Sequence, residues 1–268
     1  MEKITRDAVE FAGVRGRGFH VDDEGQVLCR QIDKFNLYVD MNDESVTPCL
    51  IRDGYWESWI TAWCFNNIGP DDNCVDIGAN MGYFTGIFAE ISLGGNVIAF
   101  EPQPVYYNLL KKSIALNQWQ NVTVYPYAIS DKEGTATLVI PGKLGGSASI
   151  AVEKFDPKWG VQTDLTVKTI CLDAWSDQRI DFIKIDAEGA EPSIWAGMQG
   201  VLANNPQCVI IMEWDARRWP TPITEFFLQK MGERFAITAI ELDGSEKQMS
   251  AHEILNSSDW EMLVLRPQ

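Results

Sequence analysis

A glycine-containing turn follows a short apolar run in the first third of the chain. The run Cys-Val-Asp-Ile (74–77) leads into Gly-Ala-Asn-Met-Gly (78–82), and a helical apolar pattern begins directly afterwards. Glycines at such a turn let the backbone approach a ligand closely, and a helix N terminus offers free N–H groups to an anionic group. Asn80 replaces the middle glycine of a dinucleotide-binding GxGxxG motif, so the turn alone is weak evidence for a nucleotide site.

An acidic residue ends the next expected strand. Glu101 lies 23 residues after Gly78, in the segment Ala-Phe-Glu-Pro (99–102). In a parallel pair of strands this position brings the carboxylate beside the glycine turn, where it can accept hydrogen bonds from both hydroxyls of a ribose. The two features together predict a ligand that contains adenosine. The alternative is an ordinary turn followed by a solvent-exposed strand end.

A third group of chemically active residues is the acidic segment Lys-Ile-Asp-Ala-Glu-Gly-Ala-Glu (184–191). Because open α/β sheets bind ligands at the carboxyl edge, we expect Asp186 and Glu188 to face the cofactor crevice. Helix capping is the alternative explanation, and it suits Glu191 better than Asp186. A carboxylate at this edge can take the proton of a hydroxyl nucleophile, so Asp186 and Glu188 are the candidate general bases, with Glu213 next. The same three acids are also a conceivable magnesium site, although we expect metal-free catalysis.

Alternating strands and helices are expected to position these groups. The pattern of strand, turn and helix repeats from residue 74 onward, which predicts a largely parallel sheet with helices on both faces, hence a Rossmann-like α/β fold. The final segments, 235–241 and 261–265, are expected to form an antiparallel edge pair. The expected strands are 74–77, 97–100, 121–129, 180–185 and 208–212, and the expected helices are 84–91, 106–114 and 194–202.

Two segments fall outside this alternation. Residues 17–41 alternate around the turn 22–25 and predict an antiparallel hairpin, followed by an amphipathic helix from Trp56 that ends before residue 69. Residues 135–172 contain two strand-like stretches around a Gly/Ser loop, and we interpret them as a flap over the substrate or cofactor. We expect one structural unit, in which a hairpin and helical cap (1–70) packs on a cofactor-binding domain (71–268).

Composition limits the partners. The net charge of −16 repels phosphate backbones and anionic lipids, so neither nucleic acid nor a membrane is an expected partner. No apolar run is long enough for a signal peptide or a membrane span, so we expect a cytoplasmic protein. The six cysteines form no CxxC pair, which predicts free thiols and no zinc. A homodimer is possible.

The motifs resemble, in order and spacing, those of FkbM-type methyltransferases. The matching stretches are VDIGANMGYFT (75–85), FEPQP (100–104), GSAS (146–149), TICLDAW (169–175) and IKIDAEGAE (183–191). The resemblance implies a class I fold with a seven-stranded sheet, S-adenosylmethionine as cofactor, and O-methylation of a small molecule, natural product or sugar. It implies that Gly78, Asn80 and Gly82 lie at the methionine end, Glu101 at the ribose, 127–129 near the adenine and Asp186 near the methyl group. The residues expected at the cofactor are Glu57, Asp76, Gly78, Ala79, Asn80, Gly82, Tyr83, Phe84, Glu101, Pro102, Tyr127, Ala128, Ile129 and Asp186.

One family feature is missing, and two other functions remain open. Family members often have a histidine two residues after the glutamate of the fifth strand, but Asp215 stands there, which puts a histidine base in doubt. His20 and His252 are expected to be surface or structural residues. An NAD-dependent oxidoreductase would share the glycine turn and the ribose acid, but it needs room for a second nucleotide. A non-catalytic binding module would not require Gly78, Glu101 and Asp186 together.

Overall fold

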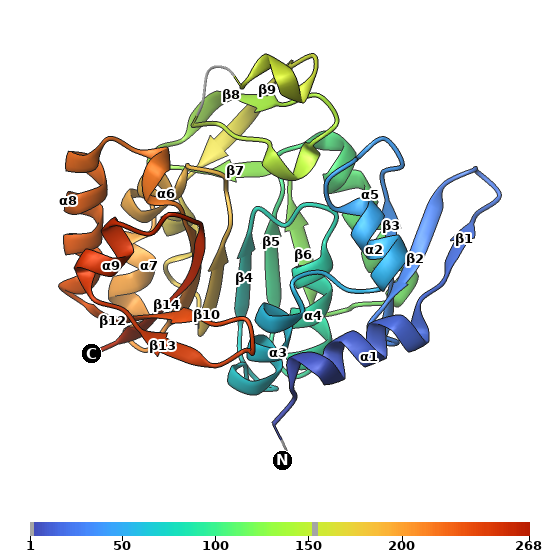
Figure 1. Ribbon diagram of the computed structural model, residues 1–268, viewed down its shortest axis with the longest axis horizontal. Coiled ribbons are helices and arrows are strands. Elements are labelled where there is room, and N and C mark those ends of the chain that lie inside the picture. Colours follow the sequence, from blue (N-terminus) through green and yellow to red (C-terminus); the bar gives the residue numbers. More distant parts are fainter. Residues whose placement is uncertain (1–2, 152–154) are drawn as a thin grey trace.

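The architecture is a mixed central sheet with helices on both faces, seen in a computed structural model that describes residues 3–151 and 155–268 (Figure 1). The eight strands are ordered β13-β12-β14-β11-β10-β4-β5-β6. Neighbours from β11 to β6 pair in parallel, whereas β14 is antiparallel to both β11 and β12. The bounds are β4 Cys74–Ile77, β5 Val97–Phe100, β6 Val122–Tyr125, β10 Phe182–Ile185, β11 Val209–Trp214, β12 Phe235–Ile240, β13 Glu246–Gln248 and β14 Glu261–Pro267.

The predicted α/β fold class is confirmed, and the sheet differs from the expectation in detail. The short strand β13 adds an eighth strand beside β12. The last two expected strands do pair with each other, but β14 lies inside the sheet, between β11 and β12, and is not an edge strand. The interior position of β14 suits its sequence, because Leu263, Val264 and Leu265 are all fully buried.

Each face of the sheet has its own apolar core, because successive side chains of a strand point to opposite faces. In β11, for example, Ile211 belongs to one cluster and its neighbours Ile210 and Met212 belong to the other. The first cluster includes side chains of α3 and α4, and the second includes side chains of α6, α7 and α8. The helices are α3 Ser58–Asn67, α4 Tyr83–Ile91, α5 Pro104–Asn117, α6 Glu191–Ala196, α7 Gln199–Asn204, α8 Thr221–Gly232 and α9 Ala251–Leu255.

The N-terminal segment forms a small antiparallel sheet, on the right in Figure 1. The predicted hairpin is present as β1 and β2, and a second reversal adds β3 after Ile32 and Asp33, both of which have positive φ. Strand β3 lies along α5, where Asn36 exchanges two hydrogen bonds with the Asn117 side chain. The helices α1 and α2 were not expected from the sequence. The bounds are α1 Arg6–Gly16, β1 Phe19–Val21, β2 Val27–Gln31, β3 Phe35–Val39 and α2 Thr47–Asp53.

The insert forms a third sheet above the carboxyl ends of β4 and β5, at the top of Figure 1. The expected strand 121–129 is divided at Pro126, which lacks a backbone donor, so β6 stays in the central sheet while β7 pairs with β9. The expected helix 194–202 is likewise two helices, which are divided at Gly197 and Met198. The Asp173 carboxylate accepts a hydrogen bond from Val201 N–H at the start of α7. The insert strands are β7 Tyr127–Ile129, β8 Gly134–Ile140 and β9 Thr163–Ile170.

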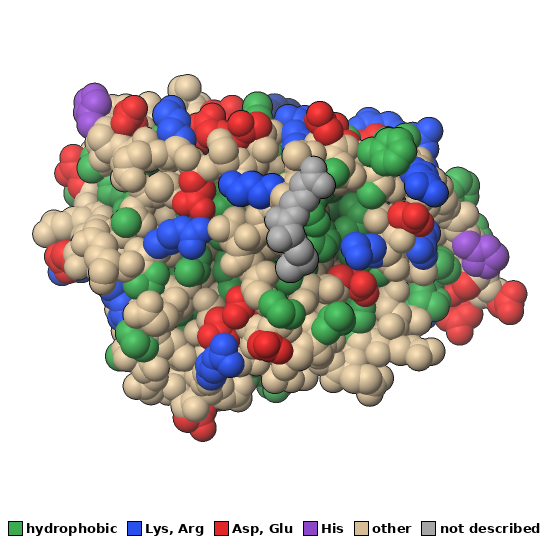
Figure 2. All heavy atoms as spheres, turned by 90° about the horizontal axis from the view of Figure 1, so that it is seen from below, with side chains coloured by type: hydrophobic (Ala, Val, Ile, Leu, Met, Phe, Trp, Pro, Cys, Tyr) green, Lys and Arg blue, Asp and Glu red, His purple; other side chains and the backbone are tan. Residues whose placement is uncertain are grey.

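The surface opposite the insert intersperses acidic, basic and apolar side chains (Figure 2). Both histidines, His20 and His252, are exposed. The six cysteines are free thiols in the part of the chain that the structure describes. Within residues 3–151 and 155–268, no helix is long and apolar enough to cross a membrane.

Candidate functional site

Two adjoining cavities lie at the carboxyl ends of β4, β5 and β10. The first, of about 560 Å³, is bounded by the turn after β4, the end of β5, strand β7 and the insert. The second, of about 950 Å³, is bounded by the same turn, the start of α3 and the ends of β10 and β11. Both are lined by Gly78, Asn80, Gly146, Asp186 and Glu188. The shared walls make the two cavities two ends of one site.

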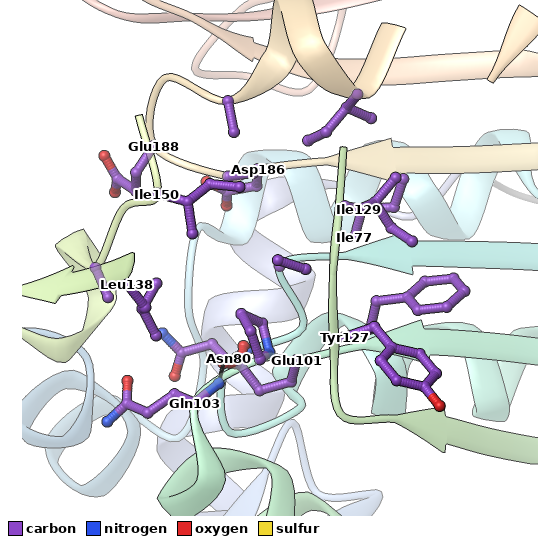
Figure 3. A pocket seen from close by; sticks show the side chains of 18 of the residues that line it. Ile77, Asn80, Glu101, Gln103, Tyr127, Ile129, Leu138, Ile150, Asp186 and Glu188 are labelled. Atoms are coloured by element: carbon purple, nitrogen blue, oxygen red, sulfur yellow. Dashed lines mark hydrogen bonds between the residues drawn. The ribbon is translucent and has the colours of Figure 1, made fainter. Parts of the chain in front are cut away.

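The carboxylate of Glu101 lies on the floor of the first cavity (Figure 3). One of its oxygens accepts a 2.7 Å hydrogen bond from Asn80 N–H, and the other accepts a 2.7 Å bond from Gln103 N–H. Burial raises the pKa of Glu101 to about 7, although the two N–H donors act in the opposite direction. Each oxygen keeps a free lone pair, so the carboxylate can accept two further hydrogen bonds from a diol.

The turn after β4 requires glycine at its first position. Gly78 has a φ of +81°, and a Cβ on it would lie 1.8 Å from the carbonyl oxygen of Asp186. The turn therefore packs directly against the turn after β10, and the two carry Asn80 and Asp186 to the same opening. Gly82, with a φ of +97°, precedes the first residue of α4 and lines neither of these two cavities.

Apolar side chains form the far wall of the first cavity. Tyr127, Ala128 and Ile129 of β7 line it together with Leu138 and Ile150 of the insert (Figure 3). The Glu101 carboxylate therefore lies beside an apolar slot, which suits an aromatic base attached to a ribose.

The second cavity contains two buried carboxylates with unused acceptor capacity. Asp76 is fully buried, and one of its oxygens accepts a 2.6 Å hydrogen bond from the Thr85 hydroxyl. Its other oxygen and one oxygen of Glu57 have no hydrogen-bond partner among the described residues. Burial, followed by the proximity of Asp186, raises the pKa of Glu57 to about 8. Unpartnered buried carboxylates are costly, so this end of the site suits a cationic ligand group.

A buried lysine lies beside these acids. Lys184 is 2% exposed, and its Nζ donates a 2.8 Å bond to the carboxylate of Asp186 while it packs over the ring of Phe84. Burial opposes its charge, but the neighbouring carboxylates of Asp186 and Asp76 outweigh this effect and raise the pKa of Lys184. Lys184 is therefore a cation that is bonded to Asp186 at the junction of the two cavities.

An arginine forms ion pairs with two further acids of the site, Glu188 and Glu213. The guanidinium of Arg218 pairs with Glu188 at 2.6 Å and also with Glu213. Burial, followed by repulsion from Glu213, raises the pKa of Glu188, and burial followed by repulsion from Asp186 raises that of Glu213. Arg218 is bonded to both of these acids, and Lys184 is bonded to Asp186, so each of the three candidate bases has one oxygen paired with a cation.

The Gly/Ser loop of the insert connects both sides of the site. Gly146 N–H donates to the Ser45 hydroxyl at 3.2 Å, and Glu44 N–H donates to the Lys143 carbonyl at 2.9 Å. Ser149 donates a 2.6 Å bond to the carbonyl of Glu188, a residue with a φ of +52°. Within the expected flap, Gly145, Gly146, Ala148 and Ile150 line the first cavity, and a role as a flap stays a prediction. Residues 152–154 of the expected flap lie outside the described residues.

Most of the expected cofactor residues line one of the two cavities. The first cavity is lined by Gly78, Asn80, Glu101, Pro102, Tyr127, Ala128, Ile129 and Asp186. The second is lined by Glu57, Asp76, Gly78, Ala79, Asn80, Tyr83, Phe84 and Asp186, together with the other two candidate bases, Glu188 and Glu213. Gly82 alone of the expected set is absent from both walls.

Sequence reasoning missed several residues of the site. Lys184 was given no role, although a lysine at an otherwise apolar strand position is a signal of a buried ion pair. Arg218 follows Glu213 by five residues, and no motif marks it. Gln103 of the first cavity and Trp260 of the second were also missed. Trp260 comes from the segment before β14, which only the folded topology brings here.

The fold and the site define a class of protein. The central sheet has five parallel strands, followed by the antiparallel β14 between β11 and β12. A glycine turn follows β4, and an acidic residue follows β5. Together these features define a Rossmann-like class I methyltransferase fold. The family model described as "Methyltransferase FkbM domain" matches residues 76–235, from β4 into the start of β12. The chain belongs to the FkbM methyltransferase domain family, and the family expected from the motifs is confirmed.

Two proteins named as methyltransferases are similar to this chain. The chain is similar to Methyltransferase sdnD of Sordaria araneosa, with 26% identity over 186 residues that cover 58% of this chain and 72% of that protein. It is also similar to Methyltransferase 1 of Beauveria bassiana (strain ARSEF 2860), with 22% identity over 148 residues. That match covers 48% of this chain and 59% of the relative.

Similar solved structures are more distant. An O-methyltransferase from Bacillus cereus in complex with SAH has a TM-score of 0.46 and 16% identity, covering 85% of this chain and 84% of that chain. A precorrin-6y C5,15-methyltransferase from Geobacter metallireducens GS-15 has a TM-score of 0.44 and 12% identity, covering 85% and 96%.

Proposed function

We propose that this protein is an S-adenosylmethionine-dependent methyltransferase that transfers a methyl group to a hydroxyl of a small molecule, natural product or sugar. The observation that carries the proposal is the Glu101 carboxylate, which two main-chain N–H groups hold beside an apolar slot with one lone pair free on each oxygen. A ribose diol with an attached adenine satisfies both features.

The residues fit the rest of such a cofactor. The unpartnered oxygens of Glu57 and Asp76 would hold its amino group, because a cation compensates their buried charge. Gly78 and Asn80 lie between this end and Glu101, since they line both cavities. When bound, S-adenosylmethionine supplies an electrophilic methyl group on its sulfonium.

Asp186 is the proposed general base. It lies on the wall shared by both cavities, and Lys184 occupies only one of its oxygens, Oδ2. The other oxygen, Oδ1, can take the proton of an acceptor hydroxyl, which is a poor nucleophile until that proton begins to leave.

The remaining walls orient the acceptor and exclude water. Leu50, Trp56 and Trp260 contribute apolar side chains to the lining of the second cavity. A transfer reaction of this kind depends mainly on alignment of the reacting atoms, so a dry and shaped cavity is the principal contribution of the protein.

The test is binding followed by transfer. Calorimetry should show that S-adenosylhomocysteine binds and NADH does not, and a methyl label from S-adenosylmethionine should appear in hydroxylated compounds of a small-molecule panel. Binding of NADH in place of S-adenosylhomocysteine would favour an oxidoreductase. Label that appears only on amines would contradict O-methylation but would still support S-adenosylmethionine as the cofactor.

A further inference from the structure

Three carboxylates are crowded together on the wall of the second cavity. Asp186, Glu188 and Glu213 each offer an oxygen atom, and these atoms lie within 4.8 Å of one another. Charges of one sign at this separation repel strongly in a partly buried site, so the cluster requires compensating cations. Three converging carboxylate oxygens are also a donor set that suits a hard divalent cation.

Side-chain cations of the chain already provide that compensation. Arg218 donates one Nη to Glu188 at 2.6 Å and the other Nη to Glu213. Lys184 donates to Asp186 at 2.8 Å. One oxygen of every carboxylate in the cluster is therefore bound to a protein cation.

A fourth acid strengthens the hold on the guanidinium. Glu191 is fully buried, one of its oxygens lies 3.9 Å from an Nη of Arg218, and its other oxygen has no hydrogen-bond partner within the described chain. The arginine thus compensates a negative charge that has no access to water. Such a charge cannot be left unpaired without cost.

The backbone around Arg218 is fixed independently of these ion pairs. The indole N–H of Trp219 donates a 2.9 Å bond to the carbonyl of Gly189, and the Asp215 carboxylate accepts a 3.0 Å bond from Arg217 N–H. The guanidinium is therefore held against the turn after β10. Arg218 itself does not line the second cavity, whereas the three carboxylates do, so it acts on the cavity from behind them.

We propose that Arg218 is a positioning residue that takes the place of a divalent cation: it holds Glu188 and Glu213 on the acceptor side of the site, and its removal turns the three carboxylates into a cation-binding site. The consequence for catalysis rests on the proposed function, because it concerns the acceptor side of a methyl-transfer site. The consequence for cation binding does not.

Manganese binding measured by electron paramagnetic resonance tests the proposal without any need for activity. The Arg218→Gln variant should bind Mn²⁺ at least about tenfold more tightly than the wild type, because a cation next to the guanidinium is repelled. The matched control is Arg217→Gln. Arg217 pairs with Asp215 and contacts none of the three carboxylates in any described hydrogen bond or ion pair, so its variant should bind Mn²⁺ as weakly as the wild type does.

Two further variants keep the test decisive. Arg218→Gln leaves Glu191 without its cation, so if this variant does not fold, the Arg218→Gln/Glu191→Gln double variant removes the uncompensated charge and should still bind Mn²⁺. Adding Glu213→Gln to either should abolish that binding. A folded Arg218 variant that binds Mn²⁺ no better than the wild type overturns the proposal, and so does a tight Mn²⁺ site in the wild type that Glu213→Gln removes.

The catalytic arm follows once an acceptor is known. Wild-type turnover should be unchanged in excess chelator, whereas turnover of Arg218→Gln should fall at least about tenfold and recover in part when Mn²⁺ is added. Wild-type activity that requires an added divalent cation overturns the proposal. If no methyl transfer is found at all, the proposed function fails while the manganese result still decides the role of Arg218.

Discussion

The main-chain N–H of Asn80 donates a 2.7 Å hydrogen bond to the carboxylate of Glu101, which joins the turn after β4 to the end of β5. Asn80 reaches this position with a φ of +53°, a conformation that asparagine tolerates better than most residues. The bond orients the carboxylate but leaves it able to accept more hydrogen bonds. The ribose-binding group is thus in place before any ligand arrives, which lowers the entropic cost of binding.

Cofactor affinity should depend on pH through Glu101. Burial raises its pKa to about 7, and a protonated carboxyl accepts hydrogen bonds from a diol less well than a carboxylate does. Binding of S-adenosylhomocysteine should therefore weaken as the pH falls from 8 to 6, by up to about tenfold per pH unit below the pKa. Calorimetry at several pH values measures this.

The Glu101→Gln variant is the control for that measurement. Glutamine keeps the size of the side chain but does not titrate, so the affinity of this variant should be lower at pH 8 and should lose the part of the pH dependence that Glu101 contributes. A wild-type affinity that does not change between pH 6 and pH 8 would contradict the role of Glu101.

Substitution of Gly78 should destabilise the fold and damage the site together. In Gly78→Ala the new methyl group would meet the carbonyl oxygen of Asp186 at 1.8 Å in a left-handed backbone, so both turns must move. We expect a loss of about 2–4 kcal/mol in the free energy of unfolding. Urea denaturation measures it, and Gly232→Ala serves as control, because no described atom lies within 4 Å of its Cβ position. Equal stability of the two variants would contradict the predicted steric clash between residue 78 and the carbonyl oxygen of Asp186.

The strand pattern of the sequence predicted the central sheet because apolar runs alternate with helical patterns at regular spacing. Glu101 and Asp186 were found for the same reason, since each directly follows a buried strand and parallel strands end at one edge. Gly78 was found from its place in the turn. The break at Pro126 shows the limit of the method, because a continuous apolar run does not reveal which of two sheets each half joins. The break at Gly197 was missed because the helical spacing of apolar residues continues through it from α6 into α7.

The residues that were missed depend on contacts between distant segments. Arg218 pairs with Glu188 across 30 positions of sequence, and neither residue predicts the other locally. The short helix α2 has only seven residues and starts without a side-chain cap, so the proline in its first turn and the following Gly54 were not enough to predict it. The hydrogen bond between Gly146 and Ser45 joins segments 101 positions apart, and only the fold brings them together.

Asp186→Asn should lower turnover and leave cofactor binding nearly unchanged. The amide cannot accept the proton of the acceptor hydroxyl, and loss of a general base lowers rates by about 10²–10⁴-fold. Single-turnover transfer of a methyl label measures the effect, and calorimetry with S-adenosylhomocysteine checks binding. Asp181→Asn is the matched control, because Asp181 immediately precedes β10 and bonds to Asn73 away from the cavities. Unchanged turnover in Asp186→Asn would remove Asp186 as the base.

Glu57→Gln should stabilise the protein at high pH while it weakens the site. Burial raises the pKa of Glu57 from 4.5 to about 8, so the folded state favours the protonated form. The stability that Glu57 contributes is therefore fully present below pH 4.5 and is lost as the pH rises through about 8. Glutamine mimics the protonated form at every pH, so the variant should equal the wild type near pH 4 and exceed it by about 1–3 kcal/mol above pH 8.

Backbone strain cannot explain such a difference, because residue 57 keeps its left-handed φ of +40° in both proteins. Urea denaturation across this pH range measures the gain, and calorimetry at pH 8 should show weaker binding of S-adenosylhomocysteine, whose amino group loses an anionic partner. A variant that is less stable than the wild type above pH 8 would show that Glu57 is compensated within the free protein. In that case the carboxylate of Glu57 would not need a cationic ligand group as its partner. The assignment of this end of the second cavity to the amino group of the cofactor would then fail.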